Sequence, residues 1–559
     1  MANKSYKKNN SILENESGAF VYPPGTRQGF ALLYPNSYKA GMSNLGFHII
    51  YRQINLRSDT ACERFFLPTD KDRELLSVEN SRKLADFTVI GAMMSFEPDY
   101  FNLLSMLEMG KVTLLASERK EKDPIVILGG PCATFNPEPL AAFAEVCVIG
   151  EGEEVVGNIL DSLYSNSNLP RAEKLKSLAQ IPGVYVPKFY TPVYSNEGKL
   201  SGIKTPDDVP GRISRQWIKD IDKYPGYYQI ITQNTEFSSM FVIEVARGCG
   251  RHCRFCMAGY CFRPPRQRNL EVLWQDISQR PTASKKVGLL GASVCDYPDI
   301  EVLTQKLAEG KIPFSLSSLR ADRLNRDFVR RLVQSGLKSL TVAPEAGSQR
   351  LRQVINKGIE EEDILRAVAY AHEEGISNIR LYFMVGLPTE TIDDIYAIEE
   401  LVLKAQAQSK KGRVTLSINP FVPKPFTPFQ WDSMIDEKTF AQRINYLKNV
   451  FKNQKNIDMK VESYKSSLVQ AALSCGERKT GELLLEAYKK GGSKEFARLI
   501  KKEHGLPCYK TQDYLPWEHL HMGFEKEYLL QEREKALKEA QTAMCFAGCL
   551  RCGVCEGEL

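Results

Sequence analysis

The sequence predicts an α/β fold with an open, Rossmann-like N-terminal domain, a partial (β/α)6 barrel of the TIM type and a mainly helical C-terminal region. One observation is that short β-branched runs alternate with amphipathic helical patterns over 28–166, which is typical of βαβ units with buried parallel strands. The same alternation returns over 239–421. The length of 559 residues also exceeds one core, since domains of roughly 100–200 residues suggest three or four.

Changes in pattern and composition divide the chain into six segments. We expect a flexible segment at 1–27, an open α/β domain at 28–166, a β-rich connection at 167–236, the barrel at 237–450, a helical domain at 451–544 and a cysteine-rich tail at 545–559. In the first domain the strand candidates are 29–36, 85–94, 123–130 and 144–152. Open sheets of this kind bind ligands beyond the carboxyl ends of their strands, so the glycine-bearing turns at 129–131 and 150–153 are candidate binding turns.

Six strand candidates with helical patterns between them predict the incomplete barrel. They are 239–246, 286–292, 313–319, 339–346, 378–388 and 413–421. Barrels of this type carry their chemistry at the carboxyl ends of the strands. A group of three cysteines begins just past the first candidate strand, at that end.

Composition and charge exclude some classes of protein and leave others open. The chain is 43% hydrophobic and 25% charged, which indicates a globular protein, and its apolar runs fall short of the roughly 18 residues that a membrane span needs. No apolar stretch follows Met1, so we expect a cytoplasmic protein with no membrane partner. The net charge of +6 neither demands nor excludes a nucleic-acid partner.

Three cysteines in "RGCGRHCRFC" form the pattern C-x3-C-x2-C and predict a metal centre. Cys249, Cys253 and Cys256 follow a buried strand, and three thiolates suit a [4Fe–4S] cluster that leaves one iron open. Two alternatives remain at this point. One is a zinc site that recruits His252 as a fourth ligand, and the other is a set of plain buried cysteines.

The triplet in its place after the first strand resembles the signature of the radical S-adenosylmethionine (SAM) superfamily, and Phe255 matches the aromatic residue usual before the last cysteine. The resemblance implies that SAM binds the open iron and is reductively cleaved to methionine and a 5′-deoxyadenosyl radical. It also implies SAM contacts along the barrel. Gly291 in "LLGASVCD" would lie near the amino group, Glu345 and Gly347 in "APEAGSQRLR" near the ribose, and Gly386 in "FMVGLPTET" near the adenine.

The N-terminal domain resembles the cobalamin-binding domain that precedes this barrel in one branch of the superfamily. The resemblance implies cobalamin contacts from the turns at Gly129, Gly130 and Pro131 and at Gly150, Glu151 and Gly152, together with Tyr38, Gly41 and Ser95. One departure is that "NSYKAGMSNLG" (36–46) lacks the histidine of D-x-H-x-x-G, and His48 lies further on. We therefore expect no histidine from this loop to ligate the cobalt, so that water or Tyr38 would occupy its lower face. The alternative is a degenerate domain that binds nothing.

The chain as a whole resembles an uncharacterised bacterial family that combines these two domains with a helical C-terminal region. The stretches "FVPKPFTPFQW" (421–431) and "LPWEHLHMGFEKEYLLQEREKAL" (515–537) and the terminal "CGVC" carry the resemblance, which spans residues 28 to 555. It strengthens the expected architecture more than the expected reaction.

The tail contains four more cysteines in the pattern C-x3-C-x2-C-x2-C. Cys545, Cys549, Cys552 and Cys555 predict an auxiliary [4Fe–4S] cluster or a zinc ion, or else a tail without metal.

The stretch 247–268 holds six arginines and no acid. It could contact RNA phosphates, balance the charge of an anionic cluster, or form a solvated face.

These features together predict a cobalamin-dependent radical SAM methyltransferase that methylates an unactivated carbon of an unknown substrate. Its electron donor would be a reductase, flavodoxin or ferredoxin. One alternative is methylthio transfer to tRNA or a ribosomal protein, because "NPFVPKPFTPFQW" resembles methylthiotransferases. The other is an RNA- or ribosome-binding protein whose iron–sulfur cluster only senses redox state.

Overall fold

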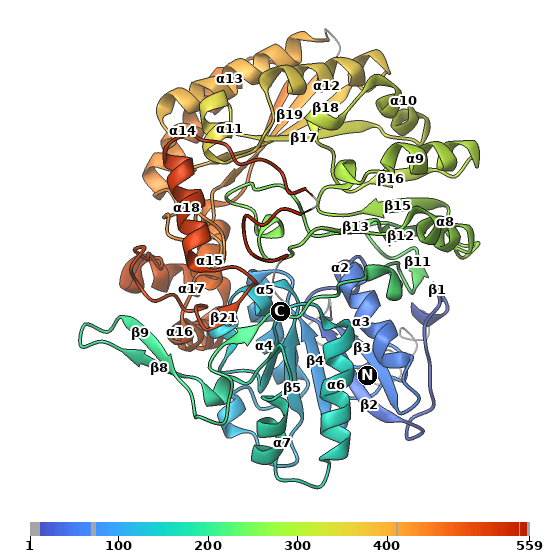
Figure 1. The fold of residues 1–559 in the computed structure, drawn as a ribbon, viewed down its shortest axis with the longest axis vertical. Helices are drawn as coiled ribbons and strands as arrows, with labels where there is room; N and C mark the ends of the chain where they lie inside the picture. Colours follow the sequence, from blue (N-terminus) through green and yellow to red (C-terminus); the bar gives the residue numbers. More distant parts are fainter. Residues whose placement is uncertain (1–11, 69–73, 410–411, 547, 556–559) are drawn as a thin grey trace.

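The computed structural model describes residues 12–68, 74–409, 412–546 and 548–555. In Figure 1 the N-terminal domain, blue to cyan, lies below the barrel, which runs from green to orange. The red C-terminal helices lie along one side, next to both domains (Figure 1). The fold class is the one that the sequence predicts, with the domains in the predicted order.

The N-terminal domain is built on a six-stranded sheet in the order β3-β2-β4-β5-β6-β7. The strands are β2 (Gln28–Tyr34), β3 (Thr60–Phe66), β4 (Val89–Met93), β5 (Ile125–Gly129), β6 (Val146–Val148) and β7 (Val184–Tyr185). The first five are parallel, and β7 pairs antiparallel to β6. The strand order reverses between β2 and β4, which is the switch point at which such sheets bind ligands.

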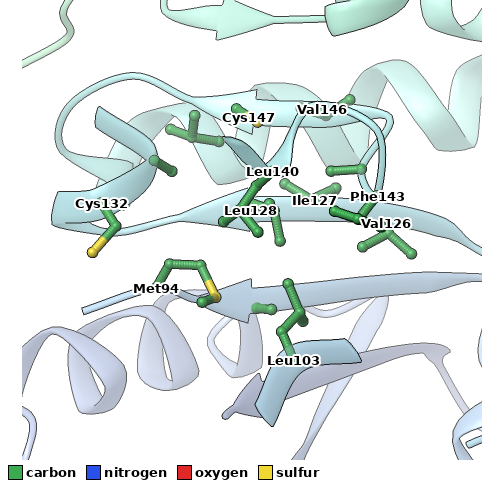
Figure 2. Packing of buried hydrophobic residues seen from close by; sticks show 14 of the residues in the cluster. Met94, Leu103, Val126, Ile127, Leu128, Cys132, Leu140, Phe143, Val146 and Cys147 are labelled. Atoms are coloured by element: carbon green, nitrogen blue, oxygen red, sulfur yellow. The ribbon is translucent and has the colours of Figure 1, made fainter. Parts of the chain in front are cut away.

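Helices cover both faces of this sheet and close its core. They are α2 (Tyr38–Gly41), α3 (Leu45–Asn55), α4 (Tyr100–Met109), α5 (Pro131–Phe135), α6 (Gly152–Ser165) and α7 (Arg171–Leu178). Figure 2 shows Leu128 of β5 and Cys147 of β6 packed with Leu140 and Phe143 of the intervening segment. Such burial is worth about 1.5–3 kcal/mol for each large apolar side chain.

The strand β3 escaped the sequence prediction because two charged residues interrupt it. Glu63 and Arg64 lie in the middle of the strand and are 2% and 0% exposed. Arg64 pairs with Glu79 at 2.5 Å and with Glu16 at 2.7 Å, and Glu63 accepts from Ser77 at 2.6 Å. The strand is therefore fully buried, but buried ion pairs hide it from a hydrophobic pattern.

Two segment boundaries in the N-terminal half of the chain differ from the expected ones. Residues 12–27 were expected to be flexible, yet β1 (Glu16–Ser17) pairs with β11 (Ile231–Thr232), and the carboxylate of Glu16 is buried on Arg64; residues 1–11 lie outside the described part. The N-terminal sheet also continues beyond residue 166, because β7 belongs to it.

The barrel consists of seven parallel strands in two sheets. They are β12 (Met240–Glu244), β15 (Lys286–Leu290) and β16 (Phe314–Leu316) in one sheet, and β17 (Ser339–Glu345), β18 (Asn378–Val385), β19 (Arg413–Pro420) and β20 (Ile457–Val461) in the other. All six expected strands are confirmed. The additional strand β20 lies past the expected boundary at 450, and its partly exposed, polar edge gave no strong apolar run.

Six barrel helices share one hydrophobic core with both sheets. They are α8 (Leu270–Ser278), α9 (Ile300–Glu309), α10 (Arg326–Gln334), α12 (Glu361–Glu373), α13 (Ile392–Ala407) and α14 (Glu437–Phe451). The short helix α11 (Gln349–Val354) packs its Leu351 and Val354 in a smaller, separate cluster. Leu45 and Ile49 of α3 belong to the larger core as well. The helix α3 therefore joins the N-terminal domain to the barrel.

The C-terminal region packs on both domains. Its helices are α15 (Tyr464–Ser474), α16 (Arg478–Lys490), α17 (Ser493–Leu499) and α18 (Lys526–Leu537). The remaining strands are β8 (Thr191–Tyr194), β9 (Leu200–Lys204), β10 (Ile213–Ser214), β13 (Ala246–Arg247), β14 (Arg266–Gln267) and β21 (Leu520–His521). Among the described helices none combines the length and the apolar character that crossing a membrane requires.

Candidate functional site

The cysteine triplet lies on a loop that the short antiparallel pair β13–β14 brackets, directly after β12. Cys253 is buried, and Cys249 and Cys256 are partly exposed. The Arg251 amide donates to the Cys249 sulfur at 3.4 Å. The Arg254 amide donates to the carbonyl of Ile355, just past α11, at 3.0 Å. The loop is thus fixed to the barrel at the carboxyl end of its strands.

The residues of this loop fit an iron–sulfur cluster. Burial and the neighbouring thiols of Cys253 and Cys249 raise the pKa of Cys256 to about 12, so the three sulfurs share one environment whose repulsion a cationic iron core would relieve. In the described part of the chain no three His, Cys, Asp or Glu side chains converge closely enough to hold an ion. The fit therefore rests on the donor set and its setting.

His252 does not complete a zinc site with the triplet. Its Nδ1 lies 2.8 Å from the Tyr528 hydroxyl, and its Nε2 lies 3.4 Å from the sulfur of Cys545. Burial, together with nearby cations such as Arg263, lowers the pKa of His252 to about 2. The ring is therefore neutral and faces the C-terminal segment, which contradicts its role as a fourth ligand to the triplet.

Glu345 stands at the carboxyl end of β17 in an uncommon backbone conformation. Its φ is +67°, and the register of β17 against β18 shifts between Val342 and Glu345. A non-glycine residue in the left-handed region marks a local constraint that clusters at functional sites. The Lys357 ammonium donates to the Glu345 carboxylate at 2.9 Å. This places a carboxylate at the strand end where the sequence predicts a contact with ribose hydroxyls.

Lys357 is a site residue that the sequence prediction missed. It lies in the connection between α11 and α12, and its ammonium is 6.0 Å from the centre of the Phe255 ring. It also interacts electrostatically with Cys253. A cation with 11% of its side chain exposed, beside both the triplet and Glu345, can hold an anionic group there. No local pattern marks it, because only the fold brings 357 next to 255.

The three predicted glycines of the barrel lie at strand ends and allow close approach. A Cβ at Gly347 would lie 2.2 Å from the Ile398 nitrogen of α13, and a Cβ at Gly291 would lie 3.2 Å from the Ala246 carbonyl. Gly386 has a φ of +92° and donates its amide to Glu390 at 2.8 Å. These positions keep the strand ends near the triplet compact.

A cavity of about 520 Å³ lies at the carboxyl ends of β2, β4, β5 and β6 and reaches the barrel. Seven predicted residues line it, namely Ser95, Gly129, Gly130, Pro131, Gly150, Glu151 and Gly152. The sequence prediction missed Asn44, Leu45 and Gly46 at the start of α3, which also line it. On the barrel side the lining includes Glu244, Arg247 and Leu290. The cavity therefore touches both domains next to the triplet.

The cavity fits part of a nucleotide-bearing cofactor such as cobalamin. A Cβ at Gly129 would meet nothing within 4 Å, so this strand end opens into the space. Its walls are largely apolar, with Leu32, Ile127 and Val148 among them, and a few polar groups such as Ser43. Apolar walls with few polar groups are usual for cofactor sites, and the amino end of the 14-residue helix α6 at Gly152 favours negative charge.

Tyr38, Gly41 and His48 lie outside the lining of this cavity. The Tyr38 hydroxyl donates to the Glu16 carboxylate, and a Cβ at Gly41 would lie 2.4 Å from the Phe66 ring. His48 is 1% exposed, with Nε2 3.0 Å from the Met42 carbonyl and Nδ1 accepting from the Ile230 amide at 3.3 Å. None of the three is among the residues that line the cavity. Of the two expected alternatives for the lower face of cobalamin, water and Tyr38, the geometry favours water, because the Tyr38 hydroxyl has a carboxylate partner.

The arginine stretch 247–268 does not form an exposed basic surface. Arg254, Arg263, Arg266 and Arg268 are each 7% exposed or less. Arg247 pairs with Glu151, Glu153 and Glu244 at 2.9, 2.7 and 2.9 Å. Arg266 pairs with Glu151 at 2.7 Å, and Arg268 with Glu244 at 2.9 Å. These buried pairs contradict the interpretation that this stretch contacts RNA phosphates.

Comparisons with known proteins agree with this arrangement. A family model described as the radical SAM superfamily matches residues 243–402, and one described as radical SAM proteins, N-terminal, matches residues 46–187. An uncharacterized protein of Methanocaldococcus jannaschii is 31% identical over 458 residues, which cover 81% of this chain and 90% of that protein. Threonylcarbamoyladenosine tRNA methylthiotransferase MtaB of Aquifex aeolicus is 24% identical over 278 residues, covering 46% of this chain and 64% of that protein.

One solved structure that resembles the fold is the radical SAM methyltransferase TsrM from Kitasatospora setae, with tryptophan substrate and a SAM analogue bound. It covers 72% of this chain and 75% of its own, with 13% sequence identity and a TM-score of 0.48.

Proposed function

The chain belongs to the radical SAM superfamily, and from this premise we propose that it is a cobalamin-dependent enzyme that methylates an unactivated carbon atom. The observation that carries the proposal is the cavity at the carboxyl edge of the N-terminal sheet, which Glu244, Arg247 and Leu290 of the barrel also line. A cofactor held there faces the strand ends that carry the triplet. When bound, the cluster supplies reductive cleavage of SAM, and cobalamin supplies the methyl group.

The residues of the barrel bind and orient SAM. Cys249, Cys253 and Cys256 would hold the cluster. The Glu345 carboxylate accepts hydrogen bonds from the ribose hydroxyls, since an ionised carboxylate accepts only. Lys357 neutralises Glu345 and lies on the side of Phe255, where it attracts the SAM carboxylate.

The residues of the N-terminal domain hold the second cofactor and exclude water. Gly129 and Gly130 let the cofactor approach the backbone at the end of β5, and Leu32 and Val148 give it an apolar wall. The lower face has no histidine from 36–46, and His48 is engaged with backbone groups. No histidine of this segment would therefore be available to the cofactor.

The proposal predicts two products from SAM in one reaction. Anaerobically purified protein should contain cobalamin beside iron and sulfide. With cobalamin, a reductant and the right substrate, 5′-deoxyadenosine and S-adenosylhomocysteine should form together, since one SAM gives the radical and another gives the methyl group. Formation of 5′-deoxyadenosine without S-adenosylhomocysteine would contradict methyl transfer. Comparing metabolites and RNA nucleosides of a deletion strain would identify the substrate.

A substitution at Gly129 tests the cavity directly. Gly129→Leu places a side chain into open space where the cofactor would lie, at a steric cost to binding of about 1–3 kcal/mol, or roughly 5- to 150-fold in affinity. Cobalamin content should fall while iron content stays constant. The control is Gly202→Leu, on β9, where a Cβ also meets nothing within 4 Å but which lies outside the cavity. Equal cobalamin content in both variants would refute the site.

Methylthio transfer is the second candidate, favoured by the match to a tRNA methylthiotransferase. Enzymes of that kind carry a second cysteine triplet in an N-terminal domain. Here Cys62 is on β3, Cys132 on α5 and Cys147 on β6, and all three are buried. They do not form such a triplet. If the assay above gives a product that contains sulfur, methylthio transfer is the reaction and not methylation.

A further inference from the structure

The cysteine-rich tail lies directly on the loop that carries the triplet. The Cys545 amide donates to the Gly250 carbonyl at 2.8 Å, and the Cys545 sulfur lies 3.4 Å from His252 Nε2. A Cβ at Gly250 would lie 3.4 Å from the Cys545 Cβ, so the Cα of Cys249 and the Cβ of Cys545 are at most about 9 Å apart. In Figure 1 the red terminal segment passes beside the green loop.

The tail is folded into turns that hold its four cysteines in one short stretch. Cys549 is 6% exposed, and Val554 is 1% exposed and belongs to the core that the N-terminal domain shares with the C-terminal region. Gly548 and Gly553 both have a φ of +79°, which turns the chain between successive cysteines. The Cys549 amide donates to the Phe546 carbonyl at 3.1 Å, and the Gly553 amide donates to the Leu550 carbonyl at 3.3 Å. Two turns therefore fold the stretch that carries the four thiols.

Arg263 provides an independent indication of an anionic occupant. It is 1% exposed, and its guanidinium donates to Tyr528, His252 and the Gly259 carbonyl. In the described part of the chain no carboxylate forms an ion pair with it, whereas the thiols of Cys545 and Cys552 interact with it electrostatically. A buried cation without an anion is costly. Thiolates bound to a metal supply the missing negative charge.

We propose that Cys545, Cys549, Cys552 and Cys555 hold a second [4Fe–4S] cluster, which passes electrons to the cluster of the triplet. The close C-x3-C-x2-C-x2-C spacing is of the ferredoxin type rather than two separated pairs. A one-electron protein donor reduces the tail cluster from the 2+ to the 1+ state. That electron then reduces the triplet cluster from 2+ to 1+, and the tail cluster returns to 2+.

The tail is open to such a donor on one side. Phe546 and Leu550, which flank Cys549, are 65% and 60% exposed, and Cys555 is exposed. The opposite side of the same short loop contacts Gly250 and His252 of the triplet loop. The tail therefore lies between the protein surface and the triplet, as an electron relay must.

The inference rests on the assignment of the triplet to the SAM cluster, but not on cobalamin or methyl transfer. The test compares the double variant Cys552→Ser/Cys555→Ser with Cys508→Ser. Cys508 is exposed and lies in neither set of cysteines. Iron and sulfide content, SAM binding and the electron paramagnetic resonance spectrum of the reduced protein are measured for each, after anaerobic purification.

We expect the double variant to contain half the iron and sulfide and to bind SAM normally. Reduction of the triplet cluster by flavodoxin with its reductase, followed by stopped-flow absorbance, should slow about tenfold or more, while dithionite should still support SAM cleavage. The control should match the wild type. Zinc in the wild-type tail, or an unchanged rate after loss of half the iron, would overturn the relay. Both zinc content and total iron can be measured on the wild type alone, so the test does not depend on folding of the variant.

Loss of SAM binding in the double variant would also overturn the proposal, because it would show that the tail completes the SAM site. Failure of the relay leaves the products of SAM with dithionite unchanged. Failure of the methyltransferase proposal changes those products but not the iron content. The two outcomes are therefore distinguishable.

Discussion

Arg247 connects the cavity to the triplet, and its removal gives a quantitative prediction. It lines the cavity, lies two residues before Cys249, and pairs with three carboxylates. In the Arg247→Met variant, Glu151 keeps its ion pair with Arg266, and Glu244 keeps its ion pair with Arg268. Glu153 forms no other ion pair in the described part of the chain, and its side chain is 5% exposed. One uncompensated buried carboxylate therefore remains.

The expected loss is about 3 kcal/mol in the free energy of unfolding, the low end for breaking a buried ion pair, because the Arg247 side chain keeps 12% exposure. The double variant Arg247→Met/Glu153→Gln should recover most of it, since the glutamine carries no charge. Denaturant unfolding, with cobalamin and iron content measured alongside, tests both. The control Arg330→Met removes a surface arginine with two carboxylate partners and should change stability little. An undiminished loss in the double variant would refute the electrostatic reasoning.

Two further predictions concern SAM binding and acid stability. Glu345→Gln should weaken SAM binding about tenfold or more at unchanged iron content, because hydrogen bonds to a charged acceptor are worth about 1.5–3 kcal/mol; equilibrium dialysis measures this, and equal affinity would remove Glu345 from the site. Burial lowers the pKa of His48 to about 4, below the unfolded value of about 6.5. The neutral His48 ring therefore contributes its full share to the free energy of unfolding above about pH 6.5. This share is lost as pH falls toward 4, and the loss reaches about 2 kcal/mol by pH 5. Unfolding of His48→Gln should depend less on pH between 7 and 5, and an equal slope would contradict the buried neutral ring.

The parts of the site that the sequence predicted are those encoded by local spacing. Three cysteines within eight positions, and glycines at the ends of β5 and β6, need no tertiary information to be recognised. The expected barrel strands are also recognisable locally, since β17 and β18 alternate buried with less buried residues along the chain. In each case residues close in the chain carry the whole signal.

The parts that the sequence missed depend on partners far apart in the chain. The charges inside β3 are compensated by Glu16, which lies 48 residues before Arg64, and Glu16 also engages Tyr38. Lys357 reaches Phe255 from another connection of the barrel. The arginines of 247–268 look like a basic patch only when their carboxylate partners at 151, 153 and 244 are not placed beside them. Pairing of buried charges thus accounts for these misses.

The loop from 247 to 268 links the triplet to the two other candidate cofactor sites. At its two ends Arg247 and Arg266 hold Glu151 at the cavity, and in its middle His252 and Arg263 contact the tail. Because the triplet lies between these contacts, a shift of the N-terminal domain moves the same backbone that positions the cluster. Cobalamin binding should therefore alter the spectrum of the reduced triplet cluster even without substrate. The Arg247→Met variant should lose this response while it still binds SAM, since Glu345 ends β17 of the other barrel sheet and its partner Lys357 lies between α11 and α12. A response that survives in Arg247→Met would show that the coupling does not run through this arginine.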